Sequence, residues 1–115
     1  METLAHPDRA GLRIEAVIAA LDHPVRLRVV RTLAAARTEL TCQQILPDMT
    51  KSSASHHWRV LRENGVVTQR REGRYLYQSL RRDDLDARFP GVLDAIVGHR
   101  TPFSCPPKKP PISAY

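Results

Sequence analysis

The segment from Thr50 to Leu80, TKSSASHHWRVLRENGVVTQRREGRYLYQSL, constrains the fold of this 115-residue chain more than any other. Its first half predicts a helix, because Ala54, Trp58 and Leu61 recur at intervals of four and three residues and share one face. The hydroxyl of Thr50 is suited to capping the free amides of the first turn. One face of this helix must be buried, and the opposite face is left to meet a partner.

The opposite face of this helix is small, polar and partly cationic, which suits a helix lying in the major groove of DNA. At 100° per residue it is centred on Ser52, His56 and Arg59. We predict that the DNA-binding residues of this helix are Lys51, Ser52, Ser53, Ser55, His56, Arg59 and Arg62.

A basic hairpin is predicted after Gly65, a residue suited to the left-handed position that closes many helices. Residues 66–71 and 74–80 are rich in β-branched and aromatic side chains, and Glu72-Gly73 between them indicates a tight turn. We expect this hairpin to meet DNA as a wing. Its predicted contact residues are Arg70, Arg71, Arg74 and Tyr75.

The net charge is concentrated in this helix and hairpin. Residues 51–82 contain eight basic and two acidic residues, a net charge of +6, which equals that of the whole chain. A single charge run is usually only a solvated face. Here the excess coincides with a helix, a turn and a hairpin, which is the footprint expected of a nucleic-acid-binding surface.

The rest of the chain predicts further helices from apolar periodicity and capping residues. One begins after Asp8 and runs to about Ala20, and a second runs from Pro24, beside His23, to about Ala36. The second helix has the wider apolar surface, which places it at the centre of the core.

A helix-turn-helix is predicted by two capped helices in succession. Thr41 and Gln44 have the spacing of a capping box, so a short helix should follow Thr41 and end before Pro47. The helix after Thr50 is then the second helix of the motif. Beyond the hairpin, residues 81–86 are polar, and residues 90–98 predict a last helix.

The expected fold is mainly α with a small β-hairpin, a winged helix-turn-helix of about five helices and a two-stranded wing. Residues 8–98 should form one DNA-binding and dimerisation domain between a flexible tail, 1–7, and a proline-rich tail, 99–115. Apolar residues on the first and last helices exceed what so small a core can cover. They form the predicted dimer interface: Ile14, Val17, Ile18, Leu21, Val92, Leu93, Ile96 and Val97.

Composition favours a cytoplasmic location. No apolar run has the length of a membrane span, and the N-terminus lacks the features of a signal peptide. Cys42 and Cys105 are far apart and suggest no disulfide framework, which suits a reducing compartment.

The chain resembles the ArsR/SmtB family of bacterial winged-helix repressors over roughly residues 10–97. The resemblance rests on four segments in matching order and spacing: LDHPVRLRVVRTL, ELTCQQI, SASHHWRVLRENGVV and RREGRYLYQSL. It implies a homodimer joined by the first and last helices, with a recognition helix in the major groove and a wing on the flanking backbone. It also implies that an inducer, often a metal ion, weakens binding to operator DNA.

The sequence departs from the metal-sensing members of that family. Arsenic sensors carry two cysteines one residue apart, and these positions are Thr41 and Gln43 here, with Cys42 between them. Zinc sensors use carboxylates and histidines along the last helix, where this chain offers only Asp94 and His99, five residues apart. We therefore predict no metal site and no cofactor, and leave the effector open.

Three alternatives to a simple DNA-binding repressor are weighed. A redox- or thiol-responsive repressor would use Cys42 or Cys105, although burial as a small apolar side chain is the simpler role for Cys42. A protein-binding winged helix would need an apolar outward face. An enzyme is not expected, because the cluster Ser55-His56-His57 has no orienting carboxylate and its adjacent side chains point about 100° apart.

Overall fold

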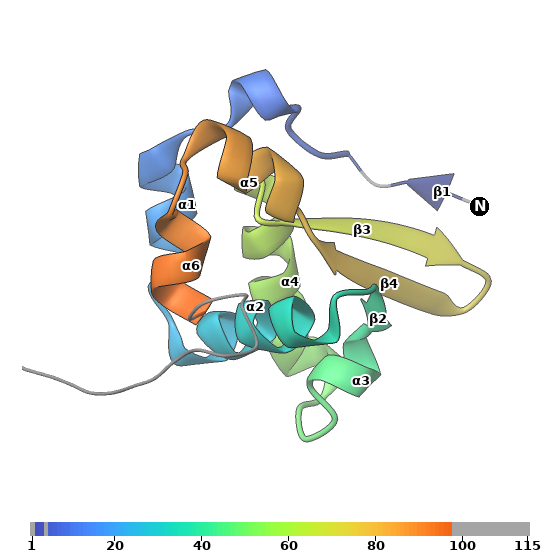
Figure 1. The fold of residues 1–115 in the computed structure, drawn as a ribbon. Coiled ribbons are helices and arrows are strands. Elements are labelled where there is room, and N and C mark those ends of the chain that lie inside the picture. Colours follow the sequence, from blue (N-terminus) through green and yellow to red (C-terminus); the bar gives the residue numbers. More distant parts are fainter. Residues whose placement is uncertain (1, 4, 98–115) are drawn as a thin grey trace, which may run out of the picture.

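The computed structural model describes residues 2–3 and 5–97. Within them lie six α-helices and one antiparallel sheet with the strand order β1-β3-β4-β2 (Figure 1). The helices are α1 (Ile14–Ala20), α2 (Pro24–Ala36), α3 (Cys42–Ile45), α4 (Lys51–Glu63), α5 (Arg82–Arg88) and α6 (Val92–Val97). The strands are β1 (Glu2–Thr3), β2 (Leu40–Thr41), β3 (Val67–Glu72) and β4 (Tyr75–Leu80). The predicted winged helix-turn-helix is confirmed.

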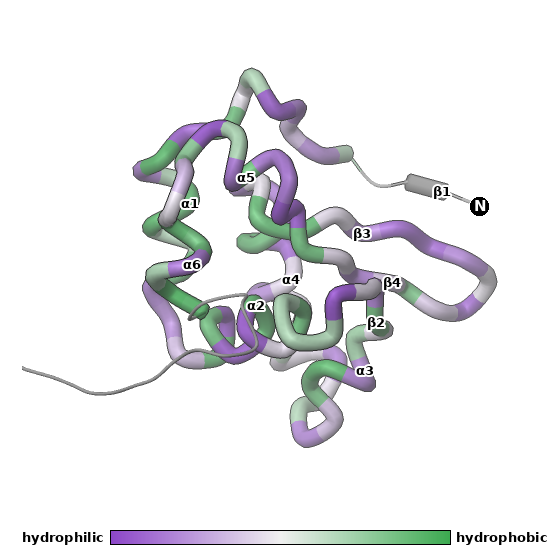
Figure 2. Tube along the Cα trace, viewed as in Figure 1, coloured by the Kyte–Doolittle hydropathy of each residue, from purple (hydrophilic) through white to green (hydrophobic). Residues whose placement is uncertain are grey.

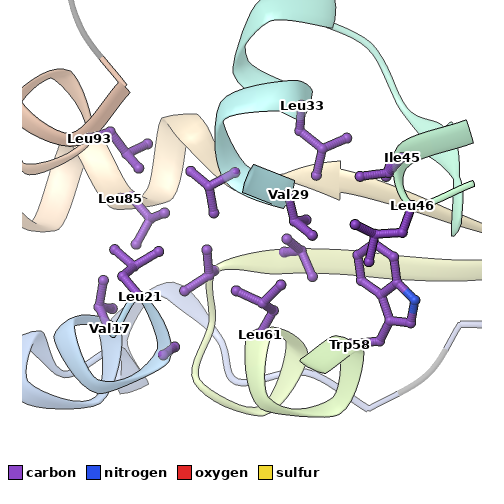
Figure 3. Packing of buried hydrophobic residues seen from close by; sticks show 14 of the residues in the cluster. Val17, Leu21, Val29, Leu33, Ile45, Leu46, Trp58, Leu61, Leu85 and Leu93 are labelled. Atoms are coloured by element: carbon purple, nitrogen blue, oxygen red, sulfur yellow. The ribbon is translucent and has the colours of Figure 1, made fainter. Parts of the chain in front are cut away.

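Helix α2 lies at the centre of the core, as its wide apolar surface predicts. Val29, Val30 and Leu33 of this helix are buried. Figure 3 shows side chains from α1, α4, α5 and α6 around them, with Trp58 of α4 beside Ile45 and Leu46 at the end of α3. Every α-helix of the described chain therefore contributes to one continuous apolar cluster.

The helix-turn-helix consists of α3 and α4, and its capping residues act as predicted. The Thr41 hydroxyl accepts a hydrogen bond from the Gln44 amide at 3.2 Å, and the Gln44 side chain accepts one from the Thr41 amide at 2.8 Å. Thr50 accepts from the Ser53 amide at 3.1 Å and caps α4. Both helix starts thus satisfy amides that would otherwise lack partners.

Gly65 closes α4 in the left-handed conformation, with φ of +81°. The Val66 amide donates to the Leu61 carbonyl at 2.9 Å, and the Gly65 amide donates to Arg62 at 3.1 Å. This is the hydrogen-bond pattern of a Schellman ending, and the positive φ confirms the left-handed position predicted for Gly65. A Cβ atom at Gly65 would lie 2.1 Å from Cδ2 of Leu12, so the position requires glycine for both conformation and space.

The predicted helix from Asp8 to Ala20 is wrong, because it is two elements. Asp8 caps a 3₁₀ turn, η1 (Arg9–Gly11), and α1 begins only at Ile14. Between them Leu12 leaves the helical conformation and is only 2% exposed. Its side chain packs beside Gly65, and this burial outweighs continuation of the helix.

Helix α5 was not predicted, because residues 81–86 read as a polar linker. Leu85 is the buried residue of this helix. Asp83 and Asp84 lie in its first turn and Arg88 in its last, the arrangement that favours the helix dipole. That charge order is the signal from which the helix could have been recognised.

The sheet is larger than the predicted two-stranded wing. β2 pairs with β4, and β1 pairs with β3, placing Glu2 opposite Arg71. The His6 Nε2 atom accepts a hydrogen bond from the Gln69 amide at 2.8 Å, and the Pro7 carbonyl accepts one from Arg81 at 2.6 Å. These contacts differ from the flexible tail expected for residues 1–7. The predicted tail at 99–115, with Cys105, lies outside the described residues.

Membrane insertion has no support in the helices that the structure describes, since none of them is both long and apolar enough to cross a bilayer.

Candidate nucleic-acid interface

Helix α4 buries one face and exposes the other. Ala54, Trp58 and Leu61 are buried, whereas the outward face is solvent-exposed. Six of the predicted DNA-binding residues lie on that exposed surface: Lys51, Ser52, Ser53, Ser55, His56 and Arg59. Within the described chain, neither Lys51 nor Arg59 forms an ion pair. Both cations are therefore presented to solvent beside small hydroxyl side chains.

Arg62, the seventh predicted residue of this helix, lies differently. Its side chain is only 22% exposed and is 3.6 Å from the Glu63 carboxylate. Its Nη1 atom donates to Oε1 of Gln69 on β3 at 3.4 Å. Arg62 thus links the helix to the wing instead of projecting from the exposed face.

Two buried glutamines hold the wing against the helix-turn-helix, and sequence reasoning missed both. Gln69 and Gln78 face each other across β3 and β4 and are at most 1% exposed. The Gln69 side chain donates to the Trp58 carbonyl at 3.0 Å, and the Gln78 side chain donates to the Cys42 sulfur at 3.1 Å. The only signal was their spacing, because Gln69 lies two residues after the apolar Val67 and therefore on the same strand face.

Adjacent wing arginines point to opposite faces of the sheet. Arg71 lies two residues after Gln69, so it shares the face that packs on α4, and it is exposed. Arg70 lies on the other face, opposite Tyr77, with its guanidinium 4.7 Å from the centre of that ring. Hydrophilic residues follow β3 toward the hairpin tip in Figure 2.

Arg70 is engaged within the chain. Its guanidinium binds both carboxylate oxygens of Glu39, at 2.7 and 2.9 Å, and contacts Glu72 at 2.5 Å. The hydrogen bond from Arg70 lowers the pKa of Glu39, and the two carboxylates raise the pKa of Arg70. Arg70 therefore joins the wing to the segment before β2, and its charge is offset locally.

The hairpin tip is formed by Gly73 and Arg74, one residue later than the predicted Glu72-Gly73 turn. Gly73 has φ of +62°, which suits the first central position of a two-residue hairpin loop. Arg74 and Tyr75 are both exposed at this tip, and the Tyr75 ring lies 6.4 Å from that of Tyr77. The predicted wing residues are thus divided between two faces and the tip.

Cys42 is half-buried beneath the wing. Its sulfur accepts from Gln78 and lies 3.7 Å from the Leu76 carbonyl oxygen. Burial raises the pKa of the Cys42 thiol, so less of the reactive thiolate forms than in an exposed cysteine. The described residues contain no group of three or more His, Cys, Asp or Glu side chains placed to hold a metal ion.

The predicted interface residues on the first and last helices are divided by burial. The single chain already buries Val17 and Leu21 of α1 and Leu93 of α6. In contrast, Ile14 and Ile18 are 37% and 58% exposed. The remaining three, Val92, Ile96 and Val97, are half-buried on α6. Helices α1 and α6 lie at the end of the molecule away from the wing, and green apolar segments mark both in Figure 2 (Figures 1 and 2).

Comparisons with known proteins agree with this geometry. A family described as a helix-turn-helix domain matches residues 21–70. YceK of Bacillus subtilis, an uncharacterized HTH-type transcriptional regulator, is 34% identical over 82 residues, which cover 70% of this chain and 82% of that protein. The transcriptional repressor BigR from Xylella fastidiosa is 26% identical, with a TM-score of 0.57 over 72% of this chain and 81% of that one. A structure of an ArsR-family transcriptional regulator, 21% identical, shares the fold with a TM-score of 0.57 over 73% of this chain and 82% of its own.

Proposed function

Because the chain belongs to the ArsR/SmtB family of winged helix-turn-helix transcriptional regulators, we propose that it represses transcription by binding operator DNA as a homodimer. The outward face of α4 reads base edges in the major groove. The wing contacts the flanking phosphates.

The exposed face of α4 is the observation that carries this proposal. This face carries small hydroxyl side chains, which permit close approach to DNA. It also carries Arg59 and His56, which can donate hydrogen bonds to bases. Arg59 is free to place its planar guanidinium against the O6 and N7 atoms of guanine. An apolar face, as a protein-binding winged helix would need, is absent from α4 because its apolar residues are buried.

The experiment that tests the proposal has two stages. Duplexes selected by the protein from a random pool define its operator, and a genome-wide binding map locates that sequence near genes. Deleting the gene for the protein should raise transcription of those neighbouring genes. Selection without any sequence preference would contradict the proposal, and falling transcription would make the protein an activator.

The wing contributes affinity without sequence discrimination. Two adjacent arginines are expected to differ, because Arg71 is available to a phosphate whereas Arg70 is paired within the chain. Arg71→Ala should weaken operator and random DNA alike and reduce the slope of log affinity against log salt by about one unit, because one phosphate contact is lost. Arg70→Ala should change that slope much less, because Glu39 and Glu72 already offset its charge. Binding isotherms at several salt concentrations measure both slopes. A larger slope change for Arg70→Ala than for Arg71→Ala would reverse these assignments.

Dimerisation is proposed to centre on the exposed isoleucines of α1 together with the half-buried residues of α6. Burial between two copies would remove Ile14 and Ile18 from water, and a two-fold dimer would span half-sites about 34 Å apart or a multiple of that distance. Residues already buried in one chain, such as Val17, can support this surface but cannot contact a partner.

The dimer is tested by placing a charge on that surface. Ile18→Glu should leave the fold intact, because the side chain is exposed, yet shift sedimentation at micromolar concentration from dimer to monomer. Operator affinity should fall about tenfold or more as two-site binding is lost. Thr38→Glu, on an exposed residue of a loop, is the control and should remain dimeric. A monomeric wild-type protein, unchanged by operator DNA, would contradict the proposal.

A further inference from the structure

A cluster of basic side chains joins the start of α2 to the recognition helix α4. The Arg26 side chain is buried, with 9% exposure, and its Nε atom donates to the Ala20 carbonyl at 2.6 Å. Its Nη1 atom lies 3.1 Å from Nδ1 of His57 on α4. The His57 ring also lies 4.5 Å from that of His23, the N-cap residue of α2. One arginine therefore spans the end of α1, the start of α2 and the recognition helix.

The contacts in this cluster require neutral imidazoles. A guanidinium can only donate, so Nδ1 of His57 must accept the bond from Arg26 and the ring proton must lie on Nε2. Nδ1 of His23 likewise accepts from the Val25 amide at 3.1 Å and thereby caps α2. Protonation of His57 at Nδ1 would remove the acceptor and place a new positive charge against the Arg26 guanidinium.

The groups that act on His57 all disfavour its protonated form. Burial, followed by the electrostatic effects of His23, Arg26 and His56, lowers the pKa of His57. His23 and Arg26 face it from α2, and His56 precedes it on α4, with ring centres 5.7 Å apart. Among the described residues that act on it electrostatically, none is a carboxylate. The hydrogen bond from Arg26 to the neutral His57 ring is therefore fully formed above the ordinary histidine pKa of about 6.5. It is lost as the pH falls through the lowered pKa of His57.

We infer that His57 is a positioning residue for DNA reading: its neutral imidazole holds α4 against Arg26, and protonation releases that hold and reduces operator selectivity. His57 lies two residues before Arg59 and directly after His56, so a shift of α4 at this point moves both base-reading side chains. Binding to random DNA depends on phosphate contacts, so the affinity for random DNA should change little when α4 shifts. The inference rests on the proposed reading of DNA by α4, and it adds acid sensitivity to that reading.

The test compares operator and random DNA at about pH 8 and about pH 5.5. For the wild type, the ratio of the two affinities should fall about three- to tenfold on acidification, the size expected for losing one hydrogen bond. In His57→Asn the ratio should hold steady, because the asparagine oxygen replaces Nδ1 as an acceptor but does not titrate. His56→Asn should lower the affinity at both pH values and still show the fall in the ratio, because Arg26 bonds to His57 and makes no hydrogen bond with His56 within the described chain. An equal fall in His57→Asn and in the wild type would overturn the inference.

A second measurement separates this inference from the proposed function. Nuclear magnetic resonance of the DNA-free protein should show His57 titrating below pH 6.5 together with amide shifts along α4, and His57→Asn should lack those shifts. If operator and random DNA bind equally at pH 8, the proposed function has failed, and these titrations still decide the positioning role. Titration of His57 without coupled shifts in α4 would overturn it.

Discussion

Replacing Gly65 by alanine is expected to lower the free energy of unfolding by about 2–4 kcal/mol. The glycine has φ of +81°, a conformation that alanine adopts only with strain. The added Cβ would also lie 2.1 Å from the Leu12 side chain, which is buried and must be displaced. Strain and overpacking therefore act together where α4 ends and the wing begins.

Gly73→Ala is the matched control for this prediction. Gly73 also has positive φ, +62°, but an added Cβ would meet no atom within 4 Å. We expect Gly73→Ala to lower the free energy of unfolding by only about 1 kcal/mol, because backbone strain is its single cost. Urea denaturation at one fixed protein concentration measures both variants, since the stability of a dimer depends on concentration. Equal losses for the two variants would show that the contact with Leu12 contributes nothing.

Replacing Arg59 by alanine is expected to narrow the preference for operator over random DNA by about 1–3 kcal/mol. Arg59 is exposed at the centre of the outward face of α4 and forms no ion pair within the described residues. A base-edge contact discriminates between sequences, so its loss should fall mainly on the operator. His56→Ala should narrow the preference in the same way but by less. The imidazole of His56 offers one ring nitrogen to a base, whereas the guanidinium of Arg59 can donate two parallel hydrogen bonds.

Arg59→Lys distinguishes base reading from simple charge. Lysine keeps the positive charge but cannot present the planar fork that binds guanine at two atoms. Binding to random DNA should therefore remain near that of the wild type, whereas operator preference should fall nearly as far as in Arg59→Ala. Full operator preference in Arg59→Lys would mean that Arg59 contacts a phosphate.

The parts of the fold that sequence predicted are those fixed by local chemistry. The caps at Thr41 and Thr50 and the left-handed Gly65 depend on residues within a few positions of one another, and all three are confirmed. The face of α4 followed from periodicity alone, because three apolar residues determine which side is buried. This is why the candidate DNA-reading surface could be located without the structure.

The features that sequence missed depend on contacts between distant residues. Arg70 resembles any other wing cation until Glu39, thirty-one positions away, is placed beside it. Gln69 shares a strand face with the apolar Val67, but its buried role is clear only when the Trp58 carbonyl is positioned to accept its hydrogen bond. The break at Leu12 depends on the space beside Gly65, which only the folded chain creates. Sequence patterns therefore predict more wing residues available to DNA than the fold leaves free. They do not show the hydrogen bonds and ion pairs that orient the wing.

The central claim is that the outward face of α4 lies in the major groove, and contacts in the complex test it most directly. Nuclear Overhauser effects between the protein and its selected operator should join Ser55, His56 and Arg59 to thymine methyl and cytosine H5 protons, which line that groove. Arg71 should show contacts with sugar protons of the flanking backbone. Base contacts arising only from the wing, or contacts of α4 with adenine H2 protons of the minor groove, would contradict this account.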